Sequence, residues 1–72
     1  MDSYEKLANA IILQAVKDYR AALKILKKRP DGIPAKGTRN EIEQFFRSGW
    51  YQQLTAVDGE MLIRRLREEA GI

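Results

Sequence analysis

The 72-residue sequence contains no cysteine and no histidine. The absence of cysteine excludes a disulfide framework and a thiolate nucleophile, and the absence of both residues excludes a zinc site of the usual Cys/His kind. Acid–base catalysis by an imidazole is excluded as well. Most hydrolase mechanisms are therefore excluded. We expect a protein that is not an enzyme and needs no cofactor or metal.

Long apolar runs are also missing. The longest, residues 10–16, is interrupted by Gln14, and none approaches the roughly 18 residues that a membrane span needs. The first ten residues, MDSYEKLANA, are mixed and acidic, unlike the basic leader of a signal peptide. These features predict a soluble, cytoplasmic protein that does not interact with a membrane.

Apolar residues recur at helical spacing along the first third of the chain and predict one long helix over residues 3–28. Lys27 and Lys28 suit its negative end, and Pro30 forces it to stop. The following residues 29–37, RPDGIPAKG, contain two prolines and two glycines and predict an exposed loop.

The second half of the chain predicts three shorter helices, over about residues 38–48, 50–56 and 59–70. Thr38, with Glu41 three residues later, has the pattern of a capping box. Ser48 and Asp58 are expected to cap the other two helices. No segment alternates like a strand for long. We therefore expect a single all-α domain over residues 1–72, in which one long N-terminal helix packs against two or three shorter ones.

The stretch FFRSGWY, residues 45–51, holds four of the six aromatic residues. A stacking platform for nucleic-acid bases would need exposed rings beside a basic groove, whereas acidic residues and neutral glutamines are the main neighbours here. We therefore expect Phe46 and Trp50 to be buried in the core and Tyr51 to point elsewhere. A helix-turn-helix with WYQQLTAV as recognition helix is the alternative, but that helix is short, uncharged and carries apolar residues that the core requires.

A basic stripe is expected on the side of the long helix opposite its apolar face. At 100° per residue, one arc collects Lys17, Arg20, Lys24, Lys27 and Lys28, and Arg29 extends it into the loop. Such a stripe can bind phosphates or an acidic partner surface. It can equally be a solvated face whose last lysines suit the helix dipole. These six residues are the candidate partner-binding residues.

Two carboxylates receive different predictions from the helical pattern. Asp18 falls inside the apolar arc of the long helix, where a carboxylate is costly unless it is paired. We therefore expect a partly buried Asp18 that is hydrogen-bonded to another element, for example to Arg47 or to the indole of Trp50. Glu43 is expected on the wet side of its helix, at i,i+4 spacing from Arg39 and Arg47.

Two segments of this sequence resemble parts of a known group of proteins. They are AVKDYRAAL, residues 15–23, and EIEQFFRSGWYQQLTAVDGEMLIRRL, residues 41–66. Together they resemble small helical proteins that prophages and mobile elements of Gram-positive bacteria encode. No activity is assigned to that group, so the resemblance implies a phage-related setting and transfers no functional residue.

The function that we expect is that of a protein-binding accessory or regulatory module whose partner is another protein. The alternative is a small nucleic-acid-binding protein that uses the basic stripe. Leu13 lies on the otherwise wet side of the long helix, an apolar exposure that the second subunit of a homodimer could cover.

Overall fold

The computed structural model describes residues 2–72, and this part of the chain is all-α, with four helices. They are α1 (Asp2–Lys28), α2 (Ile33–Phe46), α3 (Gly49–Leu54) and α4 (Gly59–Ala70). The predicted all-α fold with one long N-terminal helix is confirmed. A helix of 27 residues is about 40 Å long at 1.5 Å per residue, so α1 spans nearly the whole 43 Å length of the molecule.

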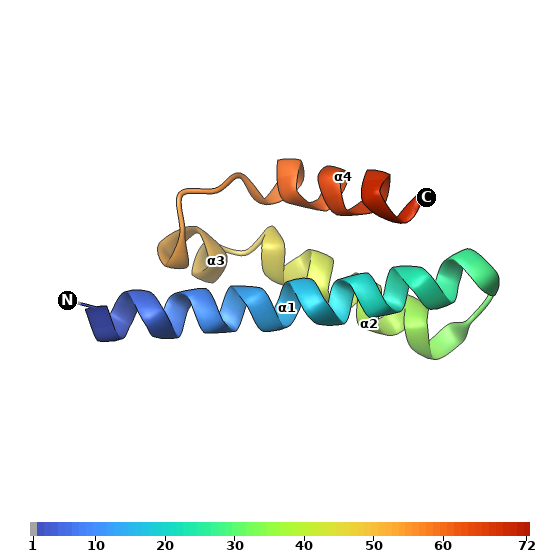
Figure 1. Ribbon diagram of the computed structural model, residues 1–72, viewed down its shortest axis with the longest axis horizontal. Coiled ribbons are helices and arrows are strands. Elements are labelled where there is room, and N and C mark those ends of the chain that lie inside the picture. Colours follow the sequence, from blue (N-terminus) through green and yellow to red (C-terminus); the bar gives the residue numbers. More distant parts are fainter. Residues whose placement is uncertain (1) are drawn as a thin grey trace.

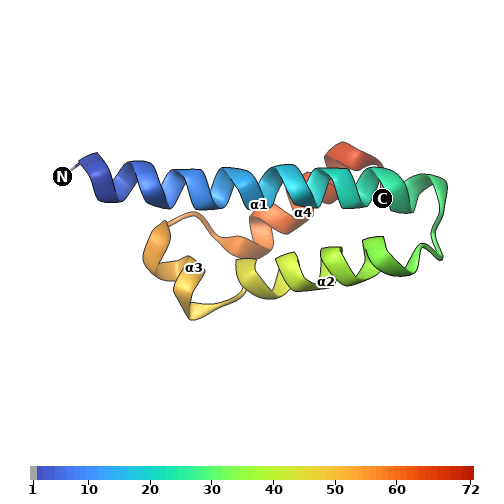
Figure 2. The ribbon, with the colours of Figure 1, turned by 90° about the horizontal axis from the view of Figure 1, so that it is seen from below.

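The other helices pack on different sides of α1. Figure 2 shows α2 running back alongside α1, with the short α3 beside the N-terminal half of α1. Helix α4 contacts both α1 and α2 and covers one face of that pair (Figures 1 and 2). The arrangement is therefore a helical hairpin of α1 and α2, with α4 packed on one of its two faces.

The loop after α1 is shorter than the sequence analysis predicted. Helix α2 begins at Ile33 rather than at residue 38, because Pro34 occupies its first turn. Proline is favoured there, since it lacks only an N–H that has no helical partner and its fixed φ suits the helix. Thr38 is consequently inside α2 and donates its hydroxyl to the Pro34 carbonyl oxygen at 3.1 Å instead of capping. The predicted loop over residues 29–37 is wrong beyond Gly32.

The two predicted caps further along the chain are confirmed. The Ser48 hydroxyl oxygen accepts a hydrogen bond from the Tyr51 backbone N–H at 3.1 Å. The Asp58 carboxylate accepts one from the Glu60 N–H at 3.0 Å. Each cap satisfies one of the free N–H groups at a helix start.

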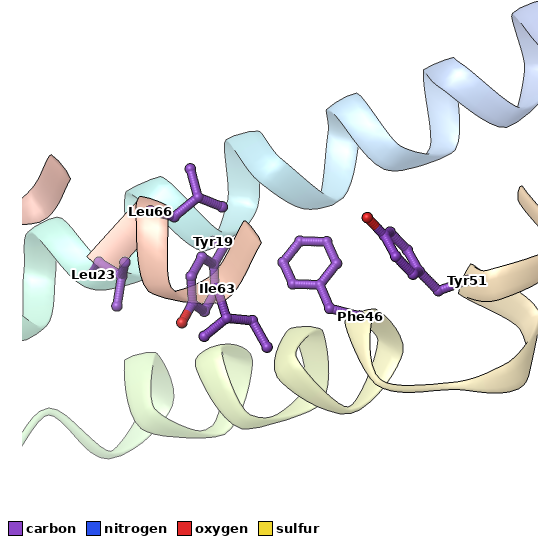
Figure 3. Close-up of a cluster of buried hydrophobic side chains, with 6 residues drawn as sticks. All are labelled: Tyr19, Leu23, Phe46, Tyr51, Ile63 and Leu66. Atoms are coloured by element: carbon purple, nitrogen blue, oxygen red, sulfur yellow. The ribbon is translucent and has the colours of Figure 1, made fainter. Parts of the chain in front are cut away.

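The core lies where α1, α2, α3 and α4 meet. Figure 3 shows a cluster of its buried side chains, which are Tyr19, Leu23, Phe46, Tyr51, Ile63 and Leu66. Phe46 stands edge-on to Tyr19, with ring centroids 5.7 Å apart, and to Tyr51, with centroids 5.6 Å apart. The predicted burial of Phe46 is confirmed.

The predictions for Trp50 and Tyr51 are both wrong. Trp50 is 57% exposed, whereas Tyr51 is only 1% exposed. The reason is the start of α3 at Gly49, directly after the Ser48 cap. In this short helix Tyr51 points inward against Phe46, and Trp50, which lies about 100° away around the axis, points outward.

Candidate functional site

A groove with apolar walls opens between α1 and α2, with α3 at one end. Its volume is about 500 Å³. The apolar side chains that line it are Ala10, Ile11, Ala15, Ile42, Phe45 and Trp50. Gln14, Asp18 and Glu41 complete the lining and are exposed to solvent.

The groove lies on the face of the α1–α2 pair that α4 does not cover. On α1, Ile11 and Asp18 lie roughly 80–100° around the helix from Tyr19, which points into the core. On α2, Glu41 and Glu43 are two residues apart and hence point in nearly opposite directions. Glu43 faces α4, whereas Glu41 lines the groove. Within residues 2–72 no helix covers this side (Figure 2).

Trp50 provides a large exposed aromatic surface at the groove. Its ring packs edge-on against Phe45, with centroids 5.3 Å apart and an interplanar angle of 70°. Phe45 is itself only half buried and also contacts Phe46 and Tyr51. Phe45 thus restrains the Trp50 ring on the side that faces the core, while Trp50 remains 57% exposed to solvent.

The apolar surface continues from the groove along the N-terminal half of α1. Tyr4 and Leu7 precede Ile11 by seven and four residues, which is the spacing of one helix face. Tyr4 is 60% exposed and Leu7 is 61% exposed. The groove is therefore the deep part of a longer apolar strip.

The prediction that Asp18 is buried and bonded to another element is wrong. The carboxylate is exposed, and it accepts a hydrogen bond of 3.0 Å from the Gln14 side chain of the same helix. The buried strip of α1 is centred on Tyr19 and Leu23 rather than on Asp18. Asp18 therefore lies on the flank of the helix, at the rim of the groove.

The buried carboxylate is Glu43 instead, which is 6% exposed. It accepts a hydrogen bond of 2.6 Å from the Tyr19 hydroxyl and one of 2.7 Å from Arg67 Nη2, and Arg47 lies 3.6 Å away. The expectation that Glu43 faces solvent is therefore wrong, although its predicted i,i+4 pair with Arg47 is confirmed. Its place three residues before Phe46, on the same helix face, is the sequence signal that could have identified it.

The environment shifts the pKa of both buried partners. Burial alone raises the pKa of the Glu43 carboxyl, but the hydrogen bonds from Tyr19 and Arg67 and the nearby guanidinium charges outweigh it. The pKa of Glu43 consequently lies below its usual value. Burial, followed by the hydrogen bond to Glu43, raises the pKa of the Tyr19 hydroxyl. These groups bind one another across α1, α2 and α4, so we assign them a structural role.

The basic stripe is exposed along its whole length, as all six candidate residues, Lys17, Arg20, Lys24, Lys27, Lys28 and Arg29, face solvent. Arg20, however, forms a two-pronged ion pair with Glu69 of α4, with N–O distances of 2.7 and 3.1 Å. Among the residues that the structure describes, the other five form no ion pair. Leu13, predicted to face solvent, is 63% exposed.

Two further features bear on the kind of site. In the described part of the chain, no three acidic side chains come together in a way that could hold a metal ion. The helices over the same residues are too short or too polar to cross a bilayer.

Comparison with known proteins gives no match: no protein-family model, curated protein or solved structure is significantly similar to this chain. Functional residues are therefore assigned from the geometry of this chain alone.

Proposed function

We propose that this chain is a non-catalytic protein-binding module, of accessory or regulatory type, that takes an apolar segment of another protein into the groove between α1 and α2. The observation that carries the proposal is the exposed Trp50 beside a groove of apolar side chains. A contiguous exposed apolar surface rimmed by polar residues is typical of a protein interaction site.

Trp50 has the properties of a residue that dominates binding energy. Tryptophan is enriched among such residues, which cluster at the centre of an interface. The contact with Phe45 restrains the ring, so less conformational entropy is lost when a partner covers it. Phe45, Ile42 and Ile11 beside it would be covered at the same time.

From the resemblance to small helical proteins of prophages and mobile elements, we propose a phage-related setting for this activity. In that setting the module acts in the bacterial cytoplasm, as a regulator or inhibitor of a host or phage protein. A small scaffold with an exposed apolar groove and a mixed-charge surface suits such a role.

Variant-dependent capture tests the proposal. The chain, Trp50→Ala and the stripe variant Lys24→Glu/Lys27→Glu are each immobilised and exposed to nuclease-treated extract of the cells that naturally contain the protein. We expect a protein that the wild type and the stripe variant retain and Trp50→Ala loses, with circular dichroism confirming that each variant is folded. Equal retention by Trp50→Ala would refute a role for the groove.

A second candidate function is nucleic-acid binding through the basic stripe. It is favoured by the five exposed cations of the basic stripe that form no ion pair within the described residues. The carboxylate of Glu69 beside Arg20 opposes it, because a negative charge there weakens the attraction for phosphate.

Salt dependence separates this function from the first. Contacts from Lys17, Lys24, Lys27 and Lys28 to four phosphates would give a log–log slope of about −3.6 on duplex DNA, at about 0.9 per contact. We expect no tight binding of duplex DNA at ~150 mM salt. Sub-micromolar affinity that Lys24→Glu/Lys27→Glu abolishes would instead establish the stripe as the functional surface.

A further inference from the structure

Helix α4 shows which kind of element packs on the α1–α2 pair. Its Ile63 and Leu66, three residues apart, enter the core. Arg67, four residues after Ile63, then reaches past them to the Glu43 carboxylate on α2. An amphipathic helix with two apolar residues and one cation at these spacings thus satisfies both the apolar surface and the carboxylate of that face.

The groove presents the same combination on the opposite face of the pair. Its walls are apolar, and one carboxylate from each helix lies at its rim, Asp18 from α1 and Glu41 from α2. Neither carboxylate forms an ion pair with any cation in the described residues. Within the described residues, the Asp18 carboxylate accepts a hydrogen bond only from the neutral side-chain amide of Gln14. The face that α4 leaves open is therefore apolar in the middle and negative at the edge.

We infer that the groove binds a basic amphipathic helix of another protein, with its apolar side against Trp50 and Phe45 and an arginine or lysine beside Asp18 and Glu41. The inference rests on the proposed protein-binding function and specifies its partner. Helix-in-groove binding of this kind uses apolar residues at i, i+3 or i+4, and i+7. The alanines at positions 10 and 15 leave room for a helix backbone to approach α1 closely.

Charge also argues against a second copy of this chain as the occupant. Two copies joined groove to groove would bring Asp18 and Glu41 near the same carboxylates of the partner. Lys17 and Lys24 of α1 lie about 100–120° around the helix from Asp18 and do not line the groove. A partner with basic residues beside its apolar face is complementary to the groove, whereas the residues of this chain that line the groove include two carboxylates and no cation.

The fluorescence of Trp50 tests the inference directly, since Trp50 is the only tryptophan of the chain. The probe is an 18-residue synthetic helix of leucine, alanine and lysine, with leucines at i, i+3 or i+4 and i+7, lysines flanking them, and no aromatic residue. We expect a saturable blue shift of the Trp50 emission, because the bound helix shields the indole from water. A second peptide with glutamate at every lysine position should bind at least about fivefold more weakly. Its negative side chains would face the negative Asp18 and Glu41 at the exposed rim of the groove.

Two double variants and one altered peptide test whether the rim carboxylates and a helical partner are required for binding. Asp18→Asn/Glu41→Gln should bind the lysine peptide about three- to tenfold more weakly than the wild type. Asp31→Asn/Glu68→Gln removes the same charge from exposed positions outside the groove and should bind like the wild type. A peptide of the same composition with two central alanines replaced by proline should not bind, because it cannot form the helix.

The outcomes separate this inference from the proposed function. Equal binding of the lysine and glutamate peptides overturns the specified charge, while a groove for apolar segments stands. Absence of any Trp50 shift with either peptide overturns the inferred class of partner, whereas the proposed function is decided by the capture experiment with Trp50→Ala. A concentration-dependent dimer in sedimentation that Trp50→Ala abolishes would identify a second copy as the occupant and overturn the inference.

Discussion

The Tyr19 hydroxyl donates a 2.6 Å hydrogen bond to the Glu43 carboxylate, and the two residues are 24 positions apart in the sequence. This bond joins α1 to α2 at the centre of the molecule, where the Tyr19 hydroxyl points toward α2 (Figure 3). Arg67 adds a third contact from α4. A buried carboxylate is unfavourable unless hydrogen bonds and opposite charge compensate for its lost hydration. The three groups are therefore expected to stabilise the fold only as a set.

Removal of the Tyr19 hydroxyl should destabilise the protein. Tyr19→Phe keeps the ring in the core but takes away one donor of the Glu43 carboxylate, which should lower the free energy of unfolding by about 1–3 kcal/mol. Tyr4→Phe, at an exposed position of the same helix, is the matched control and should change it by less than about 0.5 kcal/mol. Urea denaturation measures both, and equal effects would contradict the importance of the bond.

The protein should lose stability in acid through Glu43. The pKa of this carboxyl is lower in the folded protein than in the unfolded chain, so the folded state binds fewer protons. Its contribution is fully present above the unfolded value of about 4.3 and is lost as the pH falls through the folded pKa. The difference in unfolding free energy between wild type and Glu43→Gln, measured from about pH 7 downward, should begin to shrink near the unfolded pKa of about 4.3 and vanish below the folded pKa. A Glu43→Gln profile that runs parallel to the wild-type profile would exclude this assignment.

The two aromatic residues Phe46 and Trp50 should differ sharply in their effect on stability. Phe46→Ala leaves a cavity between Tyr19 and Tyr51 and should cost about 3–5 kcal/mol, a large part of the stability of a domain of this size. Trp50→Ala should cost about 0.5–1.5 kcal/mol, the contribution of its edge-on contact with Phe45. Thermal melts compare the two variants. Similar losses for both would place Trp50 in the core after all.

The first residues of α3 and α4 are both glycine and both follow a capping side chain, yet they should respond oppositely to alanine. A Cβ at Gly59 would lie 2.9 Å from the carbonyl carbon of Phe46 and closer still to its oxygen, so the backbone has to move. Gly59→Ala should therefore cost at least the ~1–3 kcal/mol typical of overpacking.

Gly49 is the control for this substitution, because a Cβ there meets nothing within 4 Å. Gly49→Ala should leave stability unchanged or raise it by about 0.4–1 kcal/mol, since alanine reduces the freedom of the unfolded chain. Chemical denaturation of the pair tests the close approach of α4 to the end of α2. A Gly59→Ala variant as stable as Gly49→Ala would disprove that approach.

Much of the helical architecture was predictable from local sequence. The recurrence of apolar residues predicted the long α1, and Ser48 and Asp58 were correctly identified as caps. A cap requires only a side chain and an N–H two or three residues further on, so nothing distant can alter it. The start of α2 was equally local, because Pro34 in a first turn is a helix-start signal, but its neighbouring glycines favoured a loop.

The sequence by itself thus determined that the chain forms helices and where most of them begin and end. It also determined that Phe46 is buried and that the basic stripe is exposed to solvent. It left open which flank of α1 is buried, because apolar residues extend well around this helix and Leu7 is exposed while Leu23 is not. The tertiary structure decided this when α2 and α4 met α1 along Tyr19 and Leu23. That choice buried Glu43 with Arg67 and left Asp18 at the rim of an open groove. A helical pattern specifies directions around one axis, whereas burial depends on where the other axes lie.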